Sequence, residues 1–276
     1  MRNTISTFRH LTIALILAAF PSGIVLAAEK LTIYAVNYPL AYFAERLAGD
    51  LARVEFPAPP DVDPAFWMPD AATVANYQAA DLILLNGAGY AKWVNKVSLP
   101  ASRLVNTSRD FADQYIRTSG GVSHSHGPGG EHAHGGTAFT TWLDFYLATR
   151  QAEAVAKTIT RKRPDAKDRV AKNLEALQGE LRALDERLSA IAATAPSLPL
   201  LASHPVYQYL ARRYGLNLKS VLWEPDEVPT PQQWRELERM LGEHPARWMI
   251  WEGEPLPETA NRLRALGVES IVFDPC

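Results

Sequence analysis

The segment 164-PDAKDRVAKNLEALQGELRALDERLSAIAATA-195 sets the organisation of the whole chain. Its apolar side chains recur in alternating steps of four and three residues, with charged side chains between them, which is the pattern of an amphipathic helix. The repeating positions are Val170, Leu174, Leu177, Leu181, Leu184, Leu188 and Ile191. Proline is tolerated in the first turn of a helix but cannot continue one, so Pro164 and Pro196 bound the predicted helix.

A helix of this length either pairs with a second copy as a coiled coil or packs along its own protein. Its apolar stripe spans about three heptads, which is fewer than a sustained coiled coil shows. We therefore expect a helical region at residues 146–196 that links two parts of one chain, and we expect the protein to be a monomer.

The part of the chain before this region alternates β-prone runs with helical spacing. Residues 31–36 (LTIYAV) form a short apolar run, and helical spacing follows over residues 40–49. Helical spacing returns at residues 71–80, directly before the continuous apolar run 81–85 (DLILL), which is typical of a buried parallel strand. This alternation predicts an α/β lobe with a parallel sheet over residues 28–145.

The same alternation resumes after the helical region. Strands are predicted at residues 198–202, 220–223, 248–251 and 270–273, and helices at residues 206–214, 234–241 and 258–266. This order predicts a second α/β lobe over residues 197–276. The expected fold class is therefore α/β, with two Rossmann-like lobes that each contain a parallel sheet and are joined by one long linking helix.

The N-terminal residues have the pattern of an export signal. Arg2 and Arg9 precede an apolar run over residues 11–20, and the small-residue pattern at 25–27 suits a cleavage site. The apolar run is shorter than the roughly 20 residues that cross a bilayer. We therefore expect a cleavable signal peptide at residues 1–27, export to a periplasm and no membrane anchor.

The composition excludes several classes of protein. Hydrophobic residues make up 47% of the chain, the formal charge is -2 and the pI is near 6.4, which gives no electrostatic reason to expect nucleic acid binding. The only cysteine is Cys276, so no intrachain disulfide can form and no cysteine near the predicted signal can accept a lipid. The chain is long enough to bury a substantial core in two lobes.

Residues 119–137 interrupt the first lobe with glycine, serine and histidine and almost no large apolar side chains, so they predict a long exposed loop. Two short alternating motifs in this loop hold four of the seven histidines of the chain. These four are His124, His126, His132 and His134. Because imidazole is the commonest metal-ligating side chain, the loop indicates metal binding, although its composition does not define a geometry.

Several short motifs follow one another along the chain. They are Asp63-Pro64-x-x-Trp67, Asn86-Gly87-x-Gly89, Trp142-Leu143-Asp144, Ser203-His204 and Glu224-Pro225. In this order they resemble the metal-binding family of periplasmic solute-binding proteins that serve zinc, manganese and iron ABC importers. The resemblance implies one metal ion in a cleft between the lobes, a rigid linking helix that limits lobe motion, and an ABC permease as partner. It also implies a transport protein rather than an enzyme.

The resemblance further implies metal ligands in both lobes, and here the chain departs from the family. Where the family usually has two first-lobe histidines, this chain has Ala65 and Thr140. The second-lobe positions match, and they are His204, Glu252 and Asp274. One imidazole and two carboxylates make an incomplete zinc pocket, which normally has four ligands or three and a water.

The loop histidines are the candidates to complete this site. They either replace the missing first-lobe ligands or gather metal loosely outside the site. If two or more join the ion, it has five or six nitrogen and oxygen ligands, a set that favours Fe2+ or Mn2+. Zn2+, the commonest ion in the family, is the close rival.

Other functions share parts of this pattern. A metallochaperone or metal buffer without an importer would use the same ligands. The tryptophans Trp67, Trp142, Trp223 and Trp251 are interpreted as core and cleft-wall residues, but they would also suit a wider cleft for an organic ligand or a metal chelate. A hydrolytic metalloenzyme lacks support, because the chain has neither H-E-x-x-H nor G-x-S-x-G. His244, in a polar turn, is expected to be solvated.

Overall fold

The first lobe is built on a four-stranded parallel sheet. The computed structural model describes residues 29–60, 62–118, 123–125, 131–133 and 136–276. The strands of this sheet are β1 (Leu31–Ala35), β2 (Ala52–Glu55), β3 (Leu82–Leu85) and β4 (Leu104–Asn106). Their order is β2-β1-β3-β4, so the two most apolar strands lie in the middle, as expected for parallel strands covered on both faces. The predicted signal peptide at 1–27 lies outside the described residues.

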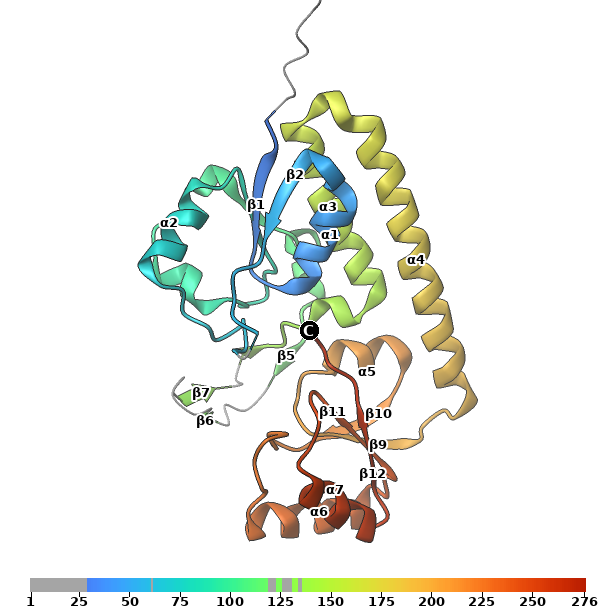
Figure 1. The fold of residues 1–276 in the computed structure, drawn as a ribbon. Coiled ribbons are helices and arrows are strands. Elements are labelled where there is room, and N and C mark those ends of the chain that lie inside the picture. The colour runs from blue at the N-terminus through green and yellow to red at the C-terminus, as the bar shows by residue number, and fades with distance from the viewer. Residues whose placement is uncertain (1–28, 61, 119–122, 126–130, 134–135) are drawn as a thin grey trace, which may run out of the picture.

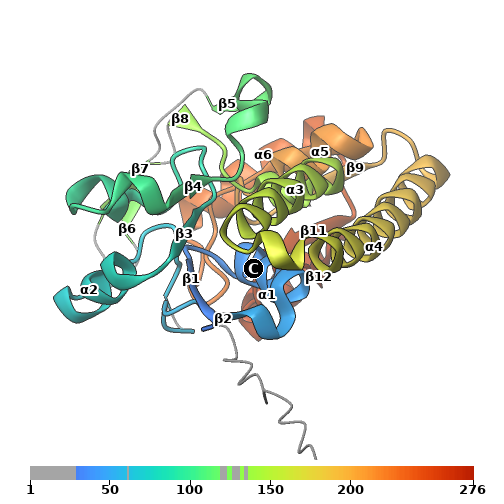
Figure 2. The ribbon, with the colours of Figure 1, turned by 90° about the horizontal axis from the view of Figure 1, so that it is seen from above.

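Three helices cover this sheet. They are α1 (Tyr38–Ala48), α2 (Ala71–Ala79) and α3 (Phe145–Lys162), with α2 on the opposite side of the sheet from α1 and α3 (Figures 1 and 2). A short polar side chain caps each helix by accepting hydrogen bonds from free N–H groups of the first turn. The capping residues are Asn37, Asp70 and Asp144. Each capping residue lies where a strand or loop ends and a helix begins.

The long helix predicted from the apolar stripe is present as α4 (Lys167–Thr194), a helix of 28 residues preceded by a 3-10 turn at Pro164–Ala166. Its first half packs against α1 and α3, and its second half runs on to the second lobe (Figure 1). The stripe is accordingly buried at Val170 and Leu177, while Ile191 is 62% exposed. The prediction of a helix that packs along its own chain is confirmed for the first half of α4, which packs against α1 and α3.

The second lobe holds another four-stranded parallel sheet. Its strands are β9 (Pro199–Ala202), β10 (Asn217–Ser220), β11 (Trp248–Trp251) and β12 (Glu269–Val272), in the order β10-β9-β11-β12. The strand predicted at residues 220–223 was wrong, because β10 is the polar segment just before it. As an edge strand, β10 tolerates polar side chains, whereas Trp223 of the apolar run is buried in the core.

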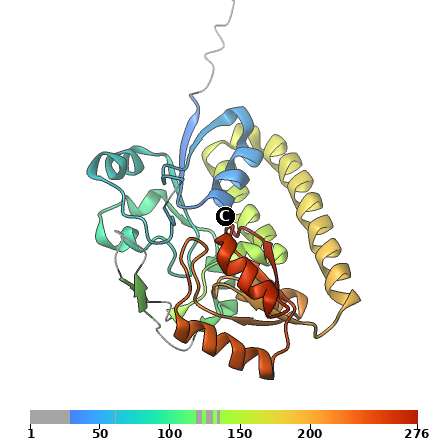
Figure 3. The ribbon, with the colours of Figure 1, turned by 60° about the horizontal axis from the view of Figure 1, so that its bottom comes forward.

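Three further helices cover the second sheet. They are α5 (Gln208–Tyr214), α6 (Pro231–Glu243) and α7 (Pro257–Ala265). The helix α5 lies on the face toward the first lobe, and α6 and α7 lie on the face away from it, where they come forward in Figure 3. Trp223 and Trp251 pack with Trp234 of α6 in the core of this lobe, which confirms the expectation of a core position for Trp223 and Trp251.

The segment predicted as a long loop is partly regular. The strand β5 (Arg117–Thr118) pairs with β8 (Gly136–Thr137), and β6 (Ser123–Ser125) pairs with β7 (Glu131–Ala133), both antiparallel. The described parts of residues 119–137, which were predicted as a long exposed loop, thus form short antiparallel strands. In the part of the chain that the structure describes, no helix combines the length and the apolarity that a membrane crossing requires.

Candidate metal site

Four acidic or imidazole side chains follow the carboxyl ends of the four strands of the second lobe. His204 follows β9, Glu224 follows β10, Glu252 follows β11 and Asp274 follows β12. Ligand sites of parallel sheets lie at this end of the strands, because the loops that leave it surround a common crevice. The fold therefore brings residues from four separate segments to one edge of the sheet.

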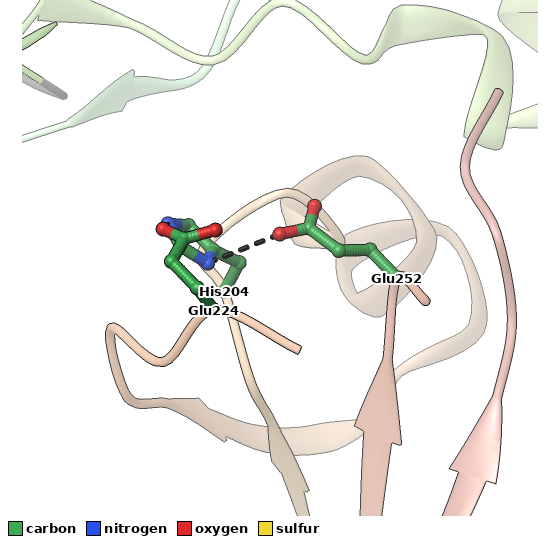
Figure 4. Close-up of side chains that lie close together, drawn as sticks. All are labelled: His204, Glu224 and Glu252. Atoms are coloured by element: carbon green, nitrogen blue, oxygen red, sulfur yellow. Dashed lines mark ion pairs between the residues drawn. The ribbon is translucent and has the colours of Figure 1, made fainter. Parts of the chain in front are cut away.

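The sheet order determines which of these residues meet. Since β10 and β11 both flank β9, Glu224 and Glu252 lie on either side of His204 (Figure 4). The Nδ1 atom of His204 lies 3.1 Å from Oε1 of Glu252, and its Nε2 atom lies 3.3 Å from Oε1 of Glu224. Each of the three residues offers one ligand atom, and these atoms all lie within 4.8 Å of one another. This spacing allows one cation to contact all three.

Glu224 was missed as a ligand in the sequence analysis, although its Glu-Pro motif was noted. The strand predicted at residues 220–223 already put Glu224 directly after a strand, the same position that Glu252 and Asp274 hold, and this was the signal that could have identified it. Asp274 lines the same cavity but stands one strand further from His204, since β12 pairs with β11 and not with β9. Its Oδ1 atom accepts a hydrogen bond of 2.8 Å from the backbone N–H of Cys276.

The charges of the cluster are unbalanced without a cation. Burial and, to a smaller extent, the nearby carboxylate of Glu252 together raise the pKa of Glu224 to about 7, against the lowering effect of His204. Burial alone would lower the pKa of His204, but the hydrogen bond and charge of Glu252 and the charge of Glu224 outweigh it and raise that pKa. A divalent cation would relieve the repulsion between the two carboxylates and displace the proton that His204 holds.

Among the described residues of the first lobe, one carboxylate lines the cavity, that of Asp63. Its Oδ1 atom accepts a hydrogen bond of 2.8 Å from the N–H of Ala65. Ala65 is buried and has no ligand atom, and Thr140 donates its hydroxyl to the carbonyl oxygen of Val206 at 2.5 Å. The two positions that depart from the family pattern thus serve packing and contact between the lobes.

The loop histidines are placed only in part. His126 and His134 lie outside the described residues, while His124 and His132 occupy paired backbone positions of β6 and β7. Their ligation of the ion stays a prediction. His244 was predicted to be solvated, and this was wrong: it is 4% exposed, and its Nε2 atom lies 2.9 Å from the carbonyl oxygen of Leu200. The end of α6 folds this ring against β9, where it fills a packing position.

The cluster opens into a cavity of about 550 Å³ between the lobes. One wall carries His204, Glu224 and Glu252, and the wall from the first lobe is aromatic. Trp142, one of the tryptophans predicted for the cleft wall, donates its Nε1–H to the carbonyl oxygen of Pro275 at 2.6 Å and so joins the two lobes there. The cluster of His204, Glu224 and Glu252 therefore forms the polar part of a larger cleft whose other walls are partly apolar.

Comparisons with known proteins agree with this architecture. Residues 33–276 match the model of the family described as ZnuA, zinc-uptake complex component A, periplasmic. The chain is 27% identical over 255 residues to the zinc-binding lipoprotein AdcA of Streptococcus pneumoniae, covering 90% of this chain and 50% of AdcA, so it spans about half the length of that relative. It is 27% identical over 219 residues to the manganese ABC transporter substrate-binding lipoprotein PsaA of the same species, covering 76% of this chain and 68% of PsaA.

Among solved structures, the metal-dependent lipoprotein YcdH of Bacillus subtilis superposes with a TM-score of 0.75 at 23% identity, covering 88% of this chain and 87% of YcdH. Likeness at this level of identity shows the fold, which is the two-lobed α/β arrangement with a long helix between the lobes. The family match extends over both lobes and the helix. This chain therefore belongs to the ZnuA family, the periplasmic metal-binding components of zinc-uptake complexes.

Proposed function

We propose that this protein captures a divalent transition-metal ion in the cleft between its lobes and delivers it to the permease of an ABC importer. The observation that carries the proposal is the meeting of His204, Glu224 and Glu252 at the ends of three adjacent strands, with ligand atoms within 4.8 Å of one another. Two carboxylates and an imidazole so close together are costly to hold without a cation. Membership of the family supports the transport role.

The donor set bears on the choice of metal. The cluster offers one nitrogen and at least two oxygen atoms, and Asp274 is the candidate for a further oxygen from the same sheet edge. Hard oxygen donors with one imidazole suit Mn2+ and Fe2+ better than a closed tetrahedral zinc site. We therefore propose Fe2+ or Mn2+ as the cargo, Mn2+ being the ion in the name of PsaA, with Zn2+ as the rival that the name of AdcA supports.

The histidines of residues 119–137 have a second role in this proposal. We propose that His124, His126, His132 and His134 collect metal near the cleft, while the second-lobe cluster holds the tight site. The backbone pairing of β6 with β7 supports a separate site, because a paired hairpin has its own geometry and does not need the second lobe to complete it. The predicted signal peptide, periplasmic location and monomeric state belong to the same proposal.

The direct test is metal binding by the purified protein. Elemental analysis of protein taken from the periplasm identifies the cargo, and anaerobic calorimetry with Fe(II), Mn(II) and Zn(II) gives the affinities. Changing His204 to alanine should lower the affinity for the preferred ion at least tenfold, because loss of a direct ligand exceeds the 10 to 100-fold effect typical of outer-shell partners. A matched His244→Ala variant should keep that affinity. Equal affinities for wild type and His204→Ala would reject the site.

A further inference from the structure

The size and the lining of the cleft suit a ligand larger than a bare ion. We propose that it binds the metal ion together with a small, electrically neutral chelator that has a flat nitrogen-donor ring, the ring lying against the aromatic wall of the first lobe. This inference rests on the proposed function and adds the chemical class of the cargo. Three observations carry it, namely the size of the cavity, the nature of the wall that faces the cluster, and the charge of the lining residues.

The cavity is larger than an ion requires. Its volume is about 550 Å³. An ion with six water molecules fills roughly 200 Å³, taking roughly 30 Å³ for each water in the liquid. Cavities of roughly 300 to 1,000 Å³ are the usual size for small organic ligands. The space beside the cluster can thus hold a ligand of several heavy atoms in addition to the ion.

Four aromatic rings of the first lobe line the cavity and contact one another. The ring of Phe139 contacts those of Phe66 and Tyr90 edge to face, with ring centroids 6.3 and 5.2 Å apart, and Tyr90 contacts Trp142 at 5.7 Å. All four rings line the cavity, and those of Phe66 and Phe139 keep part of their surface exposed. An ion held by the three donors of the cluster would keep further coordination positions, which the proposed ring ligand would occupy. Stacking makes a ring ligand there more favourable than water.

The charge of the lining selects among chelators. Five carboxylates line the cavity, together with one imidazole, and no lysine or arginine is among its lining residues in the described part of the chain. The carboxylates are Asp63, Glu224, Asp226, Glu252 and Asp274. Anionic chelators such as citrate would be repelled by the five carboxylates, because like charges are screened less inside a protein cavity than in bulk water. A neutral nitrogen donor keeps the positive charge of the ion, which the carboxylates attract.

The test uses the full-length mature protein and Zn(II), whose free concentration is held at matched values by three different chelators. Histamine chelates the metal as a neutral ligand with an imidazole ring, ethylenediamine chelates it as a neutral ligand without a ring, and citrate chelates it as an anion. If only the bare ion binds, the three saturation curves coincide. We expect histamine to move the midpoint to about tenfold lower free Zn(II) than citrate does, with ethylenediamine between them, since ring stacking and ring burial together are worth about a factor of ten. Native mass spectrometry should find histamine bound with the metal.

Two variants separate the aromatic wall from the metal cluster. Phe139→Leu and Phe66→Leu each remove one ring while keeping an apolar side chain, so each should reduce the shift that histamine causes. Trp248→Leu is the matched control, because Trp248 is an exposed aromatic residue outside the cavity lining, and the shift should stay as in wild type. A full shift in both phenylalanine variants would overturn the inference.

The outcomes also distinguish this inference from the function on which it rests. Saturable Zn(II) binding with three coincident curves would overturn the chelate inference and leave the proposed metal-binding function intact. Absence of saturable Zn(II), Mn(II) and Fe(II) binding in every chelator would reject the proposed function itself.

Discussion

Replacing Glu224 by glutamine should move two properties of the protein in opposite directions. Glutamine has nearly the same shape but carries no charge, so the metal loses one anionic oxygen from the cluster. In the metal-free protein the same change removes a carboxylate that burial and the charge of Glu252 already disfavour. Metal binding should therefore weaken while the metal-free fold becomes more stable.

The size of the effect on stability follows from the pKa of Glu224, which rises from its ordinary value of 4.5 to about 7 on folding. A carboxyl group whose pKa is raised in the folded state stabilises the fold less and less as the pH rises from 4.5 through 7. The loss amounts to about 1.4 kcal/mol for each pKa unit, or about 3 kcal/mol in all at pH 8. Glu224→Gln should recover up to that amount at pH 8 and almost nothing at pH 4.5.

The effect on binding follows from the same group. Below pH 7 the metal must displace a proton from Glu224, so the wild-type affinity should fall about tenfold from this group alone for each pH unit below 7. The glutamine variant should bind at least tenfold more weakly at pH 8 and should show a shallower dependence on pH. The assays are competition with a coloured chelator at pH 6, 7 and 8, and urea unfolding of the metal-free protein.

Glu254→Gln serves as the control, because Glu254 lies two residues after Glu252 but is exposed and outside the cavity. It should leave both the affinity and the free energy of unfolding within experimental error of wild type. The reasoning fails if Glu224→Gln keeps the wild-type affinity and pH dependence, or if its metal-free form is no more stable than wild type at pH 8.

Three further changes test other parts of the molecule. Deleting residues 123–135 should remove weak extra metal equivalents and leave one tight equivalent in calorimetry; loss of the tight site would instead make the loop histidines direct ligands. Thr140→Val removes the hydroxyl that donates to Val206 and should cost about 1 to 3 kcal/mol in urea unfolding, and an unchanged midpoint would show that the contact between the lobes is unimportant. His244→Leu should destabilise the protein by a similar amount, because it removes the hydrogen bond between the buried imidazole ring and the carbonyl oxygen of Leu200, while metal affinity stays unchanged.

Patterns that are local in sequence were sufficient for most of the fold. The apolar stripe of α4 and the continuous run of β3 report their own environment, because the period of the apolar residues reflects the geometry of the element that carries them. Edge strands are harder to predict from sequence, since their side chains are partly exposed and polar. For this reason the strand that corresponds to β10 was predicted three residues too late. The segment at residues 119–137 was predicted only as a long exposed loop, because its glycines and histidines give no period from which short strands could be predicted.

The candidate site shows which features follow from the sequence and which depend on the tertiary structure. His204 and Glu252 could be named from the chain alone, because each follows a strand and matches a family motif. That Glu224 joins them, and that Asp274 stands further away, depends on the order β10-β9-β11-β12. No local pattern encodes which strands become neighbours, since pairing is settled when separate segments pack into one sheet. Residue types and element periods are thus properties of the chain, whereas the distances between ligand atoms exist only once the sheet has formed.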